Sequence, residues 1–178
     1  MLTTTLKEIY ERSTHSHKLE KMLKRLGTTY AEAKCDETPL PITTVLDING
    51  IEYALWVLDN CTSGYICRLV KADCADRVLH IFESERPDDT RPRDSIATLR
   101  NPNATDKELA KSIGAASDAA LSAQLPAARS SGWAAASNTW AARDAASASA
   151  RFAERKAQES RLRQYLTHGE AAKDMPWD

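Results

Sequence analysis

Several features that mark particular classes of protein are missing from this sequence, and each absence narrows what the chain can do. No apolar run reaches the length of about 18 residues that a membrane helix needs, so we expect no membrane partner. Residues 1–8 lack the apolar core of a secretory signal, which predicts a cytoplasmic chain with reduced cysteines. Basic and acidic residues nearly balance, at 24 against 25, and neither half of the chain has the positive charge that nucleic-acid binding requires.

Motifs for catalysis, cofactors and metals are also missing. The chain has no P-loop, dinucleotide fingerprint, nucleophile elbow or paired-histidine metal helix. His15 and His17 have no acidic or thiol residue beside them to complete a metal site. A zinc site could be considered for four residues further on: Cys61, Cys67, Cys74 and His80. Their spacings do not include a CxxC pair, so buried cysteines acting as small apolar residues are the preferred interpretation, and no enzyme, metal or cofactor is expected.

Aromatic residues are scarce, at 6%, whereas alanine is abundant: 28 residues in all, of which 19 lie from Ala110 to Ala157. Alanine has the highest helix propensity but offers little apolar area, so such helices are stabilised by close approach of their axes. We therefore predict an all-α protein, a single compact multi-helix bundle or helical array with long Ala-rich C-terminal helices.

One row of small residues in this region keeps a spacing of about three and a half residues, which predicts a close-packed seam. The row comprises Ala116, Ala120, Ala123, Ala127, Ala134, Ala141, Ala145, Ala148 and Phe152. Leucine at Ala134 or Ala141 should therefore overpack the seam, whereas leucine at Ala135 or Ala142 should be tolerated better.

Apolar residues elsewhere recur at three- and four-residue spacing, which predicts further helices. A first helical stretch covers residues 3–26, with a break near 13–17 and an end at Gly27. A long helix is predicted around residues 66–82, and residues 42–46 are the one candidate strand.

Two helix starts are indicated by their capping residues. Asn49 followed by Glu52 has the spacing of a capping box, and Thr105 followed by Glu108 is a clearer example. Pro126 either begins a new helix or kinks one that continues, and the sequence leaves both possibilities open.

The densest group of charges lies in the loop before residue 94, and it is one of two candidate partner-binding features. The candidate residues are Asp88, Asp89, Arg91 and Arg93 of this loop, together with Trp133 and Trp140 further on. The loop could be a recognition surface, because prolines stiffen it, or an internal clasp onto Asp73 and Arg77. The tryptophans could equally be interface anchors or core anchors for the small-residue helix.

Several stretches of the chain together form a recognisable pattern. They are residues 53–56 (YALW), 68–79 (RLVKADCADRVL), 82–83 (FE) and 87–93 (PDDTRPR). The pattern resembles the "ALW … RLFAADCAERVL … FE … PDDxRPRxAIE" signature of a family of immunity proteins encoded by bacteria and phages, in which Ala-rich C-terminal helices are also typical. The resemblance covers residues 49–165. It implies an all-helical fold and a non-catalytic role in which the protein binds a toxin or nuclease and blocks it.

The resemblance also suggests a domain organisation. Residues 1–45 would form an N-terminal helical extension, residues 46–168 an Ala-rich helical immunity-like domain, and residues 169–178 a loose tail. The expected function is a protein–protein interaction module, an inhibitor or immunity-type protein directed at a host or toxin protein. The alternative is a phage structural or assembly component that oligomerises through its Ala-rich helices. A monomer or a small homo-oligomer is expected.

Overall fold

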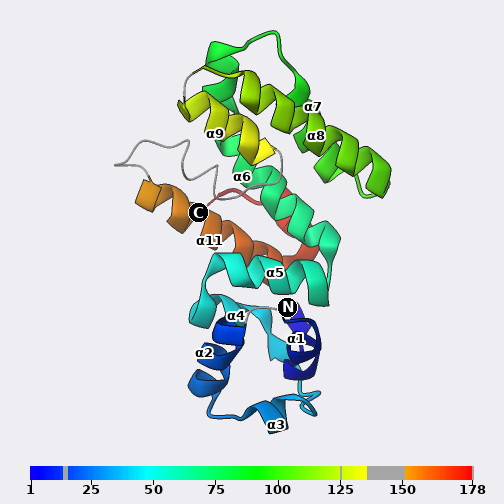
Figure 1. Cartoon of the computed structure of the whole chain (residues 1–178), viewed down its shortest axis with the longest axis vertical. Coiled ribbons are helices and arrows are strands. Elements are labelled where there is room, and N and C mark those ends of the chain that lie inside the picture. Colours follow the sequence, from blue (N-terminus) through cyan, green and yellow to red (C-terminus); the bar gives the residue numbers. More distant parts are fainter. Residues whose placement is uncertain (14–15, 125, 136–150, 178) are drawn as a thin grey trace. The chain divides into compact units, whose positions relative to one another are not determined.

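The computed structural model describes residues 1–13, 16–124, 126–135 and 151–177, and these residues are mostly helical (Figure 1). Within this part of the chain the strands are β1 (Thr3–Thr4) and β2 (Leu40–Pro41), a short antiparallel pair with Thr3 opposite Pro41. The prediction of an all-α helical array is confirmed.

The chain divides into two compact units. The first contains residues 1–67 and 159–178, and the second contains residues 68–158. These limits differ from the boundaries at 45 and 168 that the sequence suggested.

The first unit collects both ends of the chain. Its elements are α1 (Leu6–Arg12), α2 (Ser16–Leu26), α3 (Tyr30–Ala33), α4 (Ile42–Asn49), α5 (Ile51–Cys61), the start of α6 (Gly64–Glu85), the end of α11 (Arg151–His168) and the 3-10 helix η1 (Gly169–Asp174). Each contributes buried apolar side chains, such as Ile9, Met22, Leu58 and Leu166. The backbone of Leu2 donates to the carbonyl of Leu166, which ties the N-terminal segment to α11.

Helix ends in this unit follow local rules in most places. Gly27 has a φ of 69°, the left-handed conformation that ends α2 as predicted. The predicted cap at Asn49 is wrong, because Asn49 is the last residue of α4 and its buried side-chain amide donates to the carbonyl of Lys18 at 3.0 Å. Gly50, with a φ of 83°, instead separates α4 from α5. Residues 42–46 are helical and not a strand.

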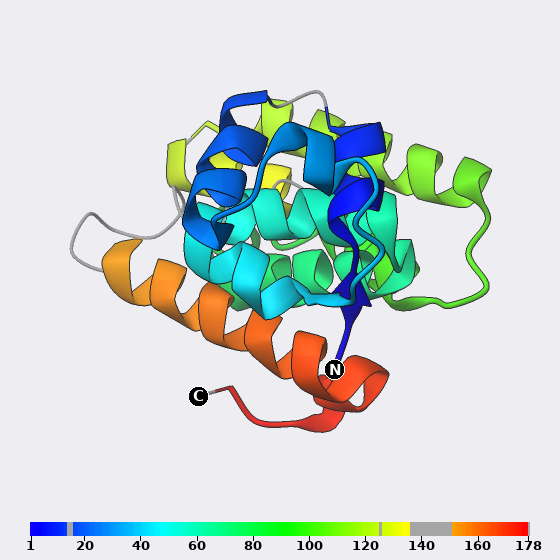
Figure 2. The same ribbon diagram turned by 90° about the horizontal axis from the view of Figure 1, so that it is seen from below.

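The C-terminal segment makes defined contacts within the first unit. The chain after α11 turns back along that helix (Figure 2), and Arg161, which is only 3% exposed, donates to the carbonyls of Lys173 and Met175. The Arg161 guanidinium also lies over the rings of Tyr165 and Trp177, at 5.0 and 5.3 Å from their centroids. Gln164 of α11 also donates to the carbonyl of Pro176 at 2.9 Å, so two buried side chains attach to α11 the segment that was expected to be loose.

The second unit contains the Ala-rich helices. Its elements are most of α6, α7 (Arg91–Arg100), α8 (Asp106–Ser122), α9 (Pro126–Ala135) and the start of α11. The long helix predicted around 66–82 is confirmed, as is the capping box in which Thr105 and Glu108 exchange side-chain and backbone hydrogen bonds. Pro126 begins a helix, since α8 has already ended at Ser122.

Alanine allows α8 and α9 to approach closely in this unit. Phe82 is fully buried in a cluster with Ala119, Ala123 and Ala128, so one large ring fills the space between small side chains. Gly132 lies inside α9 and does not interrupt it. A Cβ placed on Gly132 would lie 2.9 Å from both the Cα and the Cβ of Ala120, so only glycine fits at this contact.

The predicted alanine seam is correct only in part. Its members Ala116, Ala120, Ala123 and Ala134 are buried, at 2% exposure or less. Ala127 is exposed, and Ala128 is buried in its place. The reason is the break before Pro126, since a new helix starts with its own orientation and the spacing does not carry across. Three further seam residues lie outside the described part of the chain: Ala141, Ala145 and Ala148. Phe152 belongs to α11, but its side chain is also outside what the structure describes.

The expected contrast between Ala134 and Ala135 is wrong. Ala135 is fully buried as well, and its carbonyl accepts a hydrogen bond of 2.8 Å from the buried hydroxyl of Ser95. Both residues lie in the last turn of α9, where neighbouring elements cover more than one face of the helix. Ala142 lies outside the described residues.

Candidate functional site

The loop between α6 and α7 is fixed to the end of α8 by two hydrogen bonds. Arg86 donates through Nη2 to the carbonyl of Ser122 at 2.6 Å, and the backbone N–H of Gln124 donates to the carboxylate of Glu85 at 2.6 Å. A cation at the C-terminus of α8 is favourable because the last carbonyls of a helix lack intrahelical partners. Glu85 and Arg86 therefore position the loop that follows them.

An ion pair within the loop holds the side chain of Arg91. Its Nε and Nη2 donate to the two carboxylate oxygens of Asp89 at 2.8 and 2.6 Å, and its backbone N–H donates to Asp89 at 3.3 Å. These hydrogen bonds from Arg91 lower the pKa of Asp89 below its ordinary value. Pro92, which is buried in the first turn of α7, restricts the backbone beside the pair. The pair is preorganised by its own sequence neighbours.

Two surface clefts of the second unit meet at Arg91. One has a volume of about 480 Å³ and is lined by Glu85, Arg86, Pro87, Asp88, Asp89, Arg91 and Ser122. The other lies between α7 and α8, has a volume of about 360 Å³ and is lined by Arg91, Asp94, Thr98, Glu108, Lys111, Ser112 and Ala115. We call the residues lining these two clefts the Arg91 surface. The first cleft has a mostly polar lining and the second a more apolar one, and both open to solvent, which suits contact with another protein.

The structure brings three of the six predicted site residues together. Asp88, Asp89 and Arg91 line the first cleft, whereas Arg93 is not among its lining residues and donates to the Glu83 carboxylate at 2.6 and 3.0 Å. Trp133 belongs to α9, but its side chain lies outside what the structure describes, and Trp140 lies outside the described residues altogether. Whether the tryptophans are interface anchors stays a prediction.

Asp73 and Arg77, the two residues of the alternative clasp, each take part in an ion pair of the second unit. Asp73, which is 5% exposed, accepts a hydrogen bond of 2.8 Å from Arg100. Arg77 donates to Glu154 of α11, with its Nε at 3.0 and 3.3 Å from the two carboxylate oxygens. These two contacts of α6 stabilise the second unit. In the loop region, Arg91 pairs with Asp89 and Arg93 pairs with Glu83, and the clasp stays a prediction.

Some residues of this surface could not be found from the sequence. Glu85 and Arg86 belong to the charged run, but nothing in the run distinguishes a residue that fixes the loop from one that faces solvent. Ser122 lies far along the chain and contributes a backbone carbonyl to Arg86. No side-chain pattern signals a backbone acceptor of this kind.

The expectation of buried cysteines is correct for Cys67 and Cys74 but not for Cys61, which is half-buried, and Cys35 is exposed. Cys67 and Cys74 are buried, as expected for small apolar side chains, and the thiol of Cys67 lies 3.6 Å from the carbonyl of Leu55. Within the described part of the chain, no group of three or more His, Cys, Asp or Glu side chains is close enough to hold a metal ion. No helix in that part has both the length and the apolar character to cross a membrane.

Comparison of the chain with known protein families, with curated proteins and with solved structures finds no match. The assignment of a function therefore depends on the geometry of the Arg91 surface and on the resemblance of the sequence motifs.

Proposed function

We propose that the protein is a non-catalytic cytoplasmic inhibitor of the immunity type, which binds a host or toxin protein through the Arg91 surface. The observation that carries this proposal is the separation of two roles in the loop. Glu85 and Arg86 fix the loop to α8, whereas the Asp89–Arg91 pair lies where the two clefts meet. A fixed loop loses little conformational entropy when a partner binds, which favours affinity.

The donors of Arg91 indicate the chemistry of recognition. Asp89 engages Nε and Nη2, and the described residues provide no hydrogen-bond acceptor for Nη1. Arginine is well suited to hydrogen bonds with carboxylates and backbone carbonyls of a partner, and it is enriched among residues that dominate interface energies. Asp89 also keeps the guanidinium oriented before the partner arrives, so binding does not have to order that side chain.

The residues of the recognised motif fall into two groups, those that pack inside the second unit and those of the loop at its surface. In the stretch 68–79, Cys74, Val78 and Leu79 are buried and Asp73 bonds to Arg100, so this part of the motif maintains the second unit. The stretch 87–93 covers the loop and the first turn of α7, in which Asp88 is exposed and Pro92 is buried. A motif with a buried part and a partly exposed part supports a protein whose packed helices hold a loop for a partner to bind.

The alternative function, assembly through exposed Ala-rich helices, is less well supported. The alanines of α8 and α9 that such a surface would need are largely buried inside the second unit, among them Ala116, Ala119, Ala120, Ala128 and Ala134. Light scattering distinguishes the two functions. An inhibitor stays a monomer or dimer over a wide concentration range, whereas an assembly component forms larger species as its concentration rises.

The decisive experiment is affinity capture from a host lysate with the whole chain and with the double variant Asp89→Ala/Arg91→Ala. We expect the variant to lose the captured protein while its helical content and thermal midpoint stay nearly unchanged. The matched control is Asp106→Ala/Lys107→Ala, which also removes one acid and one base from exposed positions of the second unit and should keep the partner. A marked fall in the midpoint of the Arg91 variant with capture unchanged would refute the proposal and make the ion pair purely structural.

A further inference from the structure

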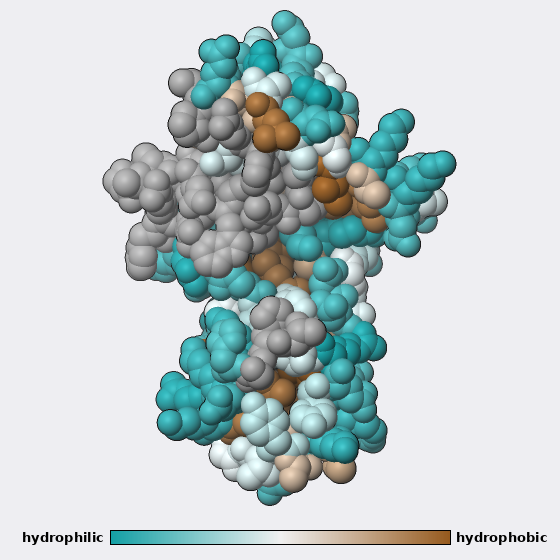
Figure 3. Space-filling view, in the orientation of Figure 1, coloured by the Kyte–Doolittle hydropathy of each residue, from teal (hydrophilic) through white to brown (hydrophobic). Residues whose placement is uncertain are grey.

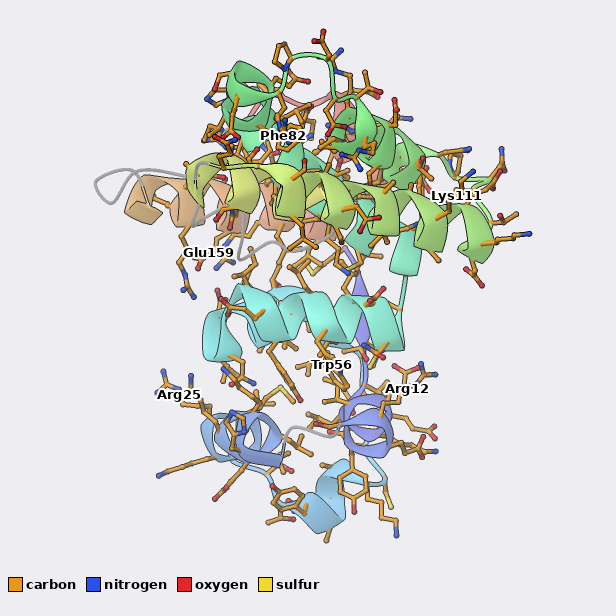
Figure 4. All side chains as sticks on the ribbon, turned by 45° about the horizontal axis from the view of Figure 1, so that its top comes forward. Arg12, Arg25, Trp56, Phe82, Lys111 and Glu159 are labelled. Atoms are coloured by element: carbon orange, nitrogen blue, oxygen red, sulfur yellow. The ribbon has the colours of Figure 1, made fainter. Side chains whose placement is uncertain are left out.

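The outer face of α2 carries a row of positive charge. At about 100° per residue, Lys18, Lys21, Lys24 and Arg25 fall within an arc of about 120° on the helix. The apolar residues Leu19, Met22 and Leu23 are buried on the opposite side. Glu20, at the edge of the arc, is the helix's one acidic residue. The surface over α2 is hydrophilic in Figure 3, and Figure 4 shows Arg25 extending outward from the helix.

The basic residues of α2 have no ion-pair partners among the described residues. Several arginines elsewhere are paired, such as Arg91 with Asp89, Arg93 with Glu83 and Arg163 with Asp47. The acidic side chains of the elements packed on α2 are already engaged. Glu32 of α3 accepts from the backbone and side chain of Thr29, and Asp47 of α4 accepts from Arg163.

The stability of α2 itself does not explain this row. Cations in the last turn, such as Lys24 and Arg25, interact favourably with the helix dipole. Lys18 lies in the first turn, where the dipole favours an acidic residue, and that turn contains none. Lys21 also lies one turn from Lys18 and from Arg25, at spacings where like charges repel. Folding alone would favour a mixture of charges on this face.

We propose that this basic face of α2 is a second interaction surface, and that it binds an acidic helix of a protein partner. The helix is about 16 Å long, the cations from Lys18 to Arg25 span about 10 Å of it, and they recur at three- and four-residue spacing. Carboxylates at the same spacing on a facing helix would meet them in register, as charged residues do at the flanks of paired helices.

A nucleic acid or a membrane fits this surface less well. About four cations would give only about four phosphate contacts, and the net charge of −1 for the whole chain opposes a polyanion at longer range. A membrane surface would be contacted only by charge, because the apolar side of α2 is buried and has nothing to insert. The inference is independent of the proposed function, since α2 belongs to the first unit and the Arg91 surface to the second.

The test measures binding of the whole chain to a synthetic helical peptide with glutamates at three- and four-residue spacing. We expect binding that weakens with salt, because the Debye length falls from about 10 Å at 0.1 M to about 3 Å at 1 M. The variant Lys21→Glu/Lys24→Glu should weaken binding by about tenfold or more. The matched control, Lys107→Glu/Lys156→Glu on α8 and α11, makes the same change in net charge at exposed lysines outside the Arg91 surface and should leave binding nearly unchanged.

Three results would overturn the proposal. The first is no measurable binding of the peptide at low salt. The second is equal weakening by the α2 variant and by the control variant, which would mean that net charge alone is responsible. The third is tighter binding of a DNA duplex or of phosphatidylserine vesicles through Lys21 and Lys24, which would assign the face to a different class of partner. Lys21→Gln/Lys24→Gln removes the charge without reversing it, and it replaces the first variant if circular dichroism shows that variant to be unfolded.

Discussion

Replacement of Gly132 by alanine tests the close contact between α8 and α9. On an isolated helix this change is stabilising by about 0.8–1 kcal/mol, because alanine restricts the unfolded chain and favours the helix. In this structure the new methyl group would lie 2.9 Å from the Cα and Cβ of Ala120. Ordinary contacts between carbon atoms need about 3.5–4.0 Å. No side-chain rotation can relieve the clash, since one of the atoms belongs to the backbone, and the two helices must move apart.

Overpacking of a core costs about 1–3 kcal/mol, which exceeds the gain in helix propensity in most of that range. We expect Gly132→Ala to destabilise the protein by about 1–2 kcal/mol, which lowers the thermal midpoint by about 2–8 °C. The control is Gly114→Ala on α8, where a Cβ meets nothing within 4 Å and where the midpoint should rise. Thermal unfolding followed by far-ultraviolet circular dichroism measures both. A Gly132 variant as stable as wild type, or more so, would refute the close approach.

Further predictions concern a cap, a packed helix and a titrating pair. Thr105→Ala removes the side-chain acceptor at the start of α8 and should destabilise the protein by about 0.5–2 kcal/mol in urea unfolding, with no change in the folded secondary structure beyond that first turn. Ala135→Leu should lower the thermal midpoint, because Ala135 is fully buried. Ala127→Leu should change the thermal midpoint little, because Ala127 is exposed. Equal effects of the two substitutions would contradict the described orientation of α9. Because the pKa of Asp89 is lowered, its contribution to stability is present above the ordinary carboxyl pKa and is lost as pH falls through the lowered value. Arg91→Ala should raise the pKa of Asp89, as measured by NMR titration of the carboxyl carbon. An unchanged pKa would exclude Arg91 as the cause of the shift.

Local signals in the sequence predicted the elements that depend on neighbouring residues. Thr105 with Glu108 indicated a capping box, and Gly27 marked a helix end, because each acts through hydrogen bonds or backbone conformation within a few residues. Asn49 carries the same kind of signal but is used differently. Its side chain donates to Lys18, distant in sequence, and this tertiary contact takes precedence over the local cap.

The sequence predicted where the candidate site lies, but it did not predict which residue of the site has which role. The run of charges from Asp88 to Arg93 identified the loop, and the prolines indicated that it is stiff. The roles within it depended on the end of α8, whose carbonyl at Ser122 accepts from Arg86. A backbone carbonyl acceptor does not depend on the type of side chain. The sequence therefore could not distinguish Arg86, which fixes the loop, from Asp89 and Arg91, which line the cleft.

The sequence by itself determined that the chain is helical, because helix propensity, apolar periodicity and caps act over distances of a few residues. The tertiary structure decided which small residues are packed and which are exposed. Ala127 and Ala128 are chemically identical, and only the start of a new helix at Pro126 assigns one to solvent and the other to the core around Phe82. The same holds for Gly132, whose necessity comes from the position of Ala120 on another helix. Contacts between helices depend on their relative positions in space, and the spacing of residues within one helix does not determine those positions.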